Sequence, residues 1–166
     1  MKTNFKAIDI SSFFIKKGVT PLKLQKLLYY SQVWFFVKND NALFDDKIQA
    51  WIYGPVVYDV WAEFRFMKRS SIIPNNRAKN LNLEKSIIDH LEEVWRSYGH
   101  LSGSDLVDLT HNDLPWKKSR KGLLGNEPTD REVLINKDTT VHFRLDVYNK
   151  IPILNTQDTL GHYSNF

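Results

Sequence analysis

The stretch from 20 to 58 limits the possible folds of this chain more than any other part, because it begins with a long helix that is apolar on nearly every side. Thr20 can cap this helix with its hydroxyl, and Pro21 suits the first helical position, where a backbone N–H is not needed. The apolar residues that follow recur at three- and four-residue steps or widen the apolar surface: Leu24, Leu27, Leu28, Tyr30, Val33, Trp34, Phe35 and Val37. Such a helix needs cover on all sides, so the sequence predicts a central, buried helix over 21–38.

The residues after this helix predict a turn, a short strand and another helix. The triplet Asn39-Asp40-Asn41 tolerates the left-handed conformation, so we expect the helix to stop near Lys38. Residues 47–53 alternate between apolar side chains and larger polar or aromatic ones, which indicates a short strand. The strand ends at Gly54-Pro55, and the apolar spacing of 56–67 predicts that a helix starts directly after this turn.

Helical spacing and capping signals place the other helices. We expect helices at 5–17 and from 82 or 83 to a stop at Gly99, with a loop or a small two-stranded element at 68–82. Capping boxes predict helix starts at Ser102 and at Thr129, and Pro115-Trp116 predicts a short helix or turn.

The last thirty residues follow a different pattern. Residues 139–148 alternate Val141, Phe143, Leu145 and Val147 with polar neighbours, which is typical of a strand, and 151–154 predicts a second extended piece. The whole pattern predicts a mainly α fold: a single compact domain of about six helices around the central helix, with small β elements near 47–53 and 139–148.

Composition excludes several classes of protein. Cysteine is absent, which removes disulfide frameworks and thiol chemistry and suits a cytoplasmic protein. The N-terminal residues do not form a signal peptide, and no stretch approaches the ~20 apolar residues of a membrane span. The net charge of +4 is lower than that of a dedicated nucleic-acid binder.

A set of short motifs occurs in order along 20–116: KLQKLLYY at 23–30, Trp34, LF at 43–44, IQAW at 48–51, YGPVV at 53–57, LTH at 109–111 and PW at 115–116. As a set they resemble the Panacea domain, also called SocA-like or phage-associated GepA-like. The resemblance implies one domain over 1–166 that is helical beyond the PW motif, so the strand-like pattern marks 137–166 as a divergent C-terminal extension. The motif residues are expected to be structural: Leu24, Gln25, Lys26, Leu27, Tyr29, Tyr30, Trp51, Gly54, Pro55, Thr110, His111, Pro115 and Trp116.

The same resemblance implies a function. Panacea-domain proteins are antitoxins, often encoded by prophages, that neutralise small protein toxins by direct binding, and a SocA-type member delivers its toxin to a Clp-type protease. The implied partners are therefore a cognate small toxin and a Clp-type protease. The family contributes no catalytic residues and no cofactor.

Two sets of residues are candidates for partner binding. The first set is aromatic, because Trp and Tyr give much contact area at low entropic cost: Trp34, Trp51, Tyr53, Tyr58, Trp61 and Trp116. Most of these side chains are nevertheless expected to pack in the core of a domain of this size. A basic run without acids follows, and it could bind a toxin or nucleic acid: Lys117, Lys118, Arg120 and Lys121. A nucleic-acid-binding regulator is therefore the alternative function, disfavoured by the modest net charge.

Evidence for an enzyme is weak. Asp105, Asp108 and His111 fall at three-residue steps that could hold a metal. Structural roles are the stronger interpretation: Asp105 as an acid at a helix start, Asp108 facing solvent, and His111 at a helix end. The other histidines lie in no catalytic motif, and the separation of Arg96 from His100 is too short for a HEPN-type ribonuclease. We therefore expect no enzymatic activity and no metal.

Overall fold

The computed structural model describes residues 5–144, and this part of the chain contains seven α-helices and a two-stranded antiparallel sheet. Their bounds are α1 Ala7–Ile15, α2 Pro21–Asn39, β1 Ile48–Trp51, β2 Gly54–Val57, α3 Tyr58–Phe64, α4 Lys85–Tyr98, α5 Gly103–His111, α6 Leu114–Ser119 and α7 Lys137–His142, with a 3-10 turn at Asn75–Arg77. The predicted mainly α fold is confirmed. Residues 68–82 form a loop around the 3-10 turn, without the additional strands that the sequence left open there.

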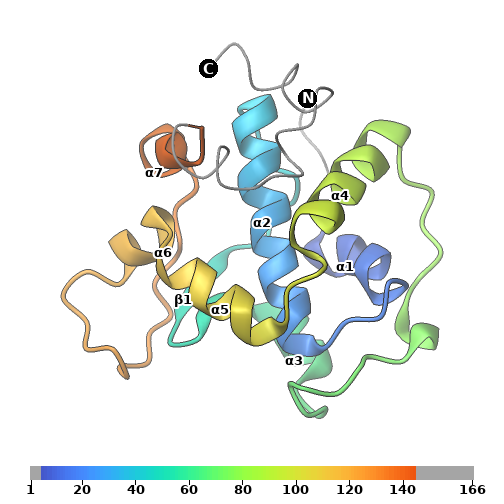
Figure 1. Cartoon of the computed structure of the whole chain (residues 1–166), viewed down its shortest axis with the longest axis horizontal. Helices are drawn as coiled ribbons and strands as arrows, with labels where there is room; N and C mark the ends of the chain where they lie inside the picture. The colour runs from blue at the N-terminus through green and yellow to red at the C-terminus, as the bar shows by residue number, and fades with distance from the viewer. Residues whose placement is uncertain (1–4, 145–166) are drawn as a thin grey trace.

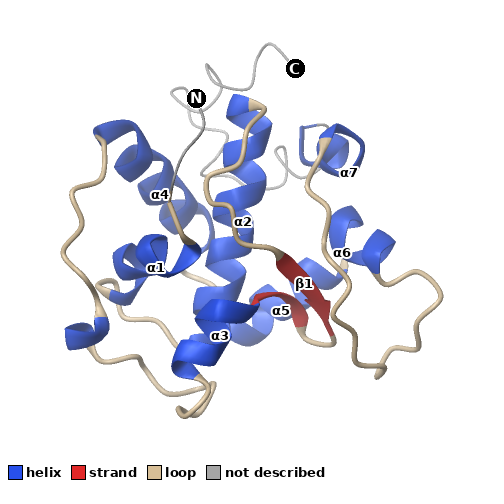
Figure 2. Ribbon diagram, turned by 180° about the vertical axis from the view of Figure 1, so that it is seen from behind, coloured by secondary structure: helices blue, strands red, loops and turns tan. Residues whose placement is uncertain are grey.

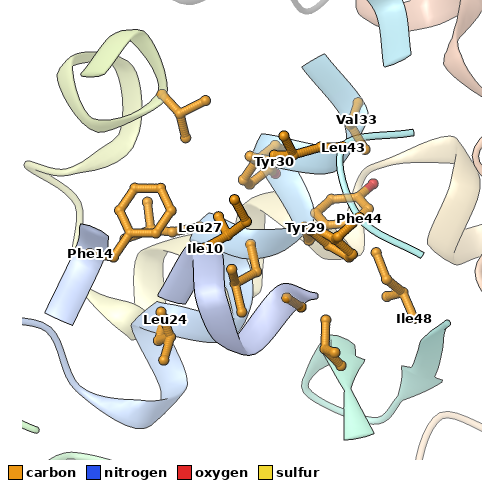
Figure 3. Packing of buried hydrophobic residues seen from close by; sticks show 14 of the residues in the cluster. Ile10, Phe14, Leu24, Leu27, Tyr29, Tyr30, Val33, Leu43, Phe44 and Ile48 are labelled. Atoms are coloured by element: carbon orange, nitrogen blue, oxygen red, sulfur yellow. The ribbon is translucent and has the colours of Figure 1, made fainter. Parts of the chain in front are cut away.

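Helix α2 is the centre of the molecule. Thirteen of its nineteen residues are buried, and it contacts α1, α3, α4, α5, α7 and β2. Figure 1 shows α1 and α4 on one side of α2 and α6 and α7 on the other, and Figure 3 shows the apolar side chains that meet around it. Among residues 5–144, none of the helices has the length and apolar composition to cross a bilayer.

Local capping chemistry fixes both ends of α2 and the start of α5 as predicted. The Thr20 hydroxyl accepts a hydrogen bond of 3.2 Å from the Lys23 backbone N–H, and Asp40 ends α2 in the left-handed conformation with φ of 53°. Ser102 and Asp105 form the predicted capping box at the start of α5.

The hairpin of β1 and β2 corrects one prediction. Val56 and Val57 were expected to begin a helix, but they pair with Gln49 and Ile48, and α3 begins only at Tyr58. β-Branched valines suit a buried strand, and here they lie beside α2. Figure 2 shows the hairpin between α2 and the α5–α6 segment.

The predicted helix start at Thr129 is also wrong. The Ala50 N–H donates to the Arg131 carbonyl at 2.9 Å, and the Val133 N–H donates to the Ile48 carbonyl at 2.7 Å. The segment thus runs along the open edge of β1, where unpaired backbone groups take up an extended chain.

The predicted strand at 139–148 is wrong wherever the structure describes it. Asn136 and Thr139 form a capping box that starts α7, and Thr140 and Phe143 are buried while Val141 is exposed. Phe143 packs edge-on against Tyr30 and Trp34, so contact with α2 overrides the alternating pattern. Residues 145–148 and the predicted extended piece at 151–154 lie outside the described residues.

The closest backbone approach in the hairpin occurs at Gly54. Its φ is +99°, and a Cβ atom placed there would lie 2.5 Å from the Thr110 hydroxyl oxygen and 3.1 Å from the Lys26 amine. Only glycine fits, because both the conformation and the space exclude a side chain.

This geometry predicts the effect of Gly54→Ala, for which Gly122→Ala is a matched control. Gly122 also has a positive φ, of +86°, but nothing lies within 4 Å of its Cβ position. We expect Gly122→Ala to cost about 1 kcal/mol and Gly54→Ala about 1–3 kcal/mol more, measured as shifts in the urea midpoint. Equal losses in the two variants would show that Thr110 and Lys26 move aside without cost.

Candidate functional site

Helix α2 holds the hairpin through two buried polar side chains. The Gln25 amide pairs with both backbone groups of Val57: its Nε2 donates to the Val57 carbonyl at 3.2 Å, and its Oε1 accepts from the Val57 N–H at 2.8 Å. The Lys26 amine donates to the Pro55 carbonyl at 2.9 Å, and burial lowers the pKa of this amine to about 7. Strand β2 is thereby fixed to the first turns of α2.

Side chains from α5 and α6 hold the other strand and the turn. The His111 Nε2 donates to the Ile52 carbonyl at 2.9 Å, and the Trp116 indole donates to the Trp51 carbonyl at 2.9 Å. The Arg120 guanidinium donates to the Ala50 carbonyl at 2.7 Å and to the carbonyls of residues 124 and 127. Three successive carbonyls are therefore bound by one short segment, which fixes the hairpin on its second side.

The other motif residues pack or support these contacts. Leu24, Leu27, Tyr29, Tyr30 and Pro115 are buried. The Tyr30 hydroxyl donates to Asp113 at 2.8 Å, where burial raises the pKa of the carboxyl to about 7. The Thr110 hydroxyl donates to the Val107 carbonyl and lies beside Gly54. The KLQK, YGP, LTH and PW motifs thus meet at a single place, the hairpin turn.

A groove lies beside the hairpin, and Gln25 and Lys26 are among the residues that line it. Its volume is about 720 Å³, within the range of ligand and side-chain sites in proteins. The start of α2, the hairpin, α3 and the 128–130 segment form its walls. Most of the lining is apolar, including Leu22, Val56, Val60, Phe64 and Met67.

Aromatic side chains line part of the groove. The Trp51 indole donates to the Gln49 side-chain oxygen at 2.7 Å, and its ring meets the Trp61 ring edge-on with centroids 5.2 Å apart. Tyr53 also lines the groove, and 54% of its surface is exposed. These rings are held in place before any partner arrives, which lowers the entropic cost of binding.

The lining of the groove carries more positive than negative side chains. Arg65 and Arg69 contribute guanidinium groups, whereas Asp130 is the one acid among the lining residues. Lys26 also borders the groove, but its amine is buried on Pro55. The positive charge that a partner can reach therefore belongs to the two arginines.

The structure separates the predicted partner-binding residues into three groups. Trp51, Tyr53 and Trp61 line the groove, and Tyr58 lies beside it, with ring contacts to Trp51 and Trp61. Trp34 and Arg120 are in the interior, where the Trp34 indole donates to the Tyr98 hydroxyl at 2.7 Å, so neither offers a surface to a partner. The exposed part of the basic run is Lys117, Lys118 and Lys121. Beside them, the Trp116 ring stacks on His111 and lies under Arg120, so its faces are already occupied.

Sequence reasoning missed the arginines of the groove. Arg65, Lys68 and Arg69 form a short basic cluster that could have drawn attention, but its position beside the aromatic residues depends on how the chain folds back after α3. It also missed Gln25 as a hairpin-binding side chain, although a glutamine inside an apolar helix face was a signal of a buried polar contact.

The metal alternative finds little support in the geometry. Asp105 is used in its capping box, which lowers the pKa of its carboxyl, and His111 is bound to Ile52. Within residues 5–144, no three His, Cys, Asp or Glu side chains cluster as metal ligands would.

Comparison with known proteins identifies relatives. Residues 24–117 match the family described as antitoxin SocA-like, Panacea domain. The antitoxin SocA of Caulobacter vibrioides (strain NA1000 / CB15N) is 30% identical over 111 residues, which cover 59% of this chain and 58% of that protein. The chain therefore aligns with little more than half the length of this relative. No solved structure matches the chain. The matched range contains Gln25, Lys26, His111 and Trp116, whereas Arg120 lies just beyond its end.

The buried Lys26 amine predicts a pH dependence of stability. Its pKa falls from 10.5 to about 7 on folding, so between these values the unfolded chain holds a proton that the folded chain lacks. The free energy of unfolding should therefore rise with pH, by up to about 1.4 kcal/mol per pH unit. Burial also lowers the pKa of Lys23 and Lys38, so Lys26→Met should reduce this rise rather than remove it, whereas the exposed Lys79→Met should keep it in full.

Urea unfolding between about pH 7.5 and 9.5 measures this slope and stays below the range near pH 10 in which tyrosines of the unfolded chain ionise. The slope is the readout, because loss of the bond to Pro55 lowers the stability of Lys26→Met at every pH. A wild-type slope equal to that of Lys26→Met would contradict the prediction.

Proposed function

Because the chain belongs to the SocA-like antitoxin family defined by the Panacea domain, we propose that it neutralises a small protein toxin by direct, non-covalent binding. The groove beside the hairpin supports this proposal most directly, since it is preformed, largely apolar and edged by exposed aromatic and basic side chains. Surfaces of this composition are typical of protein interfaces.

Binding rather than catalysis is the mode of action that we propose. The polar side chains around the hairpin donate to backbone carbonyls, which leaves His111, Trp116 and Arg120 occupied with structural contacts. The nucleic-acid alternative rests on three exposed lysines next to a tryptophan ring that already contacts two neighbours. Steric cover of the toxin's active surface needs neither a nucleophile nor a metal.

Co-expression tests the antitoxin function. The small open reading frame next to this gene would be expressed in a bacterial host with and without this protein, and surviving colonies counted. We expect the neighbour to kill cells and this protein to restore survival. A toxic neighbour that kills equally in both cases would contradict the proposal.

The same cells distinguish two routes of protection. Under direct occlusion, the toxin persists at an unchanged level in a complex that can be isolated with this protein. Under delivery to a Clp-type protease, the toxin level falls, and protection disappears in a host that lacks the protease. Immunoblots of the tagged toxin in both hosts measure the difference.

His111→Gln separates binding from catalysis. The glutamine amide can still donate to the Ile52 carbonyl, so we expect a folded variant with full protection. Asp108→Asn, an exposed change three residues earlier on α5, serves as the control. Loss of protection in a folded His111→Gln variant, with Asp108→Asn unaffected, would favour a catalytic role for the imidazole.

A further inference from the structure

We propose that the toxin occupies the groove beside the hairpin, and that it does so with a segment that presents an apolar side chain next to a carboxylate. This inference rests on the proposed antitoxin function and adds the surface and the chemistry of recognition. The evidence for it is the apolar lining of the groove and the two arginines that belong to this lining.

The apolar requirement follows from the lining. Leu22, Val56 and Val60 are among its apolar lining residues, and Trp51 and Trp61 add two aromatic rings. Water in such a space is released when an apolar group enters, which favours binding in proportion to the apolar area buried. A groove of about 720 Å³ has room for one or two large side chains of a partner.

The carboxylate requirement follows from the two arginines. Arg65 is exposed, and the structure gives its guanidinium no ion pair with a carboxylate among residues 5–144. The same holds for Arg69, whose guanidinium lies 4.9 Å from the centre of the Tyr53 ring. A guanidinium next to an apolar surface binds a carboxylate by two parallel hydrogen bonds, more strongly than in open solvent.

The backbone beside Arg69 is fixed to α2. The Leu22 N–H donates to the Arg69 carbonyl at 3.3 Å, and the Ile73 N–H donates to the Val19 carbonyl at 2.9 Å. The loop after α3 is thus tied to the start of α2 at two points, so the positive charge stands at the groove in advance. Arg69 and Tyr53 together offer a partner a charged group and an apolar ring within one contact area.

Nucleic acid fits this surface less well than a protein segment. Phosphates would pair with Arg65 and Arg69 but would leave the apolar lining of the groove uncovered. A purely apolar segment would fill the groove and leave both guanidinium groups partly desolvated without a partner. A segment with both features covers the apolar lining and pairs with the two arginines.

Titration calorimetry with the purified product of the adjacent open reading frame tests the inference. Arg65→Glu/Arg69→Glu should weaken binding at least tenfold, and Tyr53→Ala about tenfold. Matched controls lie outside the groove: Lys47→Glu/Lys79→Glu makes the same change of charge, and Phe66→Ala removes another exposed ring. Both controls should bind within about twofold of wild type.

A charge exchange identifies the carboxylate. Each Asp and Glu of the toxin would be replaced by Arg in turn, and one replacement should weaken binding to wild type yet restore binding to Arg65→Glu/Arg69→Glu. Circular dichroism melts would verify that every variant is folded.

The outcomes separate this inference from the antitoxin proposal. If wild type binds and protects while both groove variants bind equally well, the antitoxin function stands and the groove is not the docking surface. If the free chain is a dimer that the groove variants dissociate, the groove joins two copies and the inference is wrong. If wild type does not bind, the antitoxin proposal fails and the docking inference fails with it.

Discussion

The pairing of Gln25 with both backbone groups of Val57 is the contact on which the hairpin and the groove depend. A buried amide is costly unless its donor and its acceptor are both satisfied, and Val57 satisfies both in one orientation of the strand. Gln32 repeats this chemistry on Leu43 and Phe44, where its oxygen and nitrogen bind the backbone of the segment that leads to β1. Helix α2 therefore fixes the 40–57 connection by polar contacts within an apolar surface.

Lys26 and Gly54 make this arrangement specific. The amine reaches the Pro55 carbonyl only because the missing side chain at Gly54 leaves space between α2 and α5. Burial of the amine favours its neutral form, so desolvation of this group lowers the stability of the fold. The hydrogen bond that the amine makes in return fixes the position of the turn. With the turn fixed, the Trp51 and Tyr53 side chains border the groove rather than the core.

The sequence predicts what local chemistry decides. The Thr20 cap, the stop at Asp40 and the capping box at Ser102 use residues within three positions of each other, and all three are confirmed. Residues 131–133 and 139–143 were predicted wrongly because distant partners decide their structure: the open edge of β1 in one case and the surface of α2 in the other. The capping spacing at Thr129 and the alternation along 139–148 carry no information about these distant partners.

The candidate site shows the same limit. Residue type identified Trp51, Tyr53 and Trp61 as candidates for partner binding. It gave no reason to place Arg65 and Arg69 on the same surface as these rings. It also gave no reason to exclude Trp34 and Arg120, which are buried. The difference has a physical consequence for function. Substitutions that remove a hydrogen bond from a motif side chain to the hairpin backbone lower the stability of the fold, whereas Arg65 and Arg69 make no hydrogen bond through their side chains within residues 5–144. A scaffold of this kind can therefore keep its groove while the charges beside it change, and the choice of partner can change at little cost in stability.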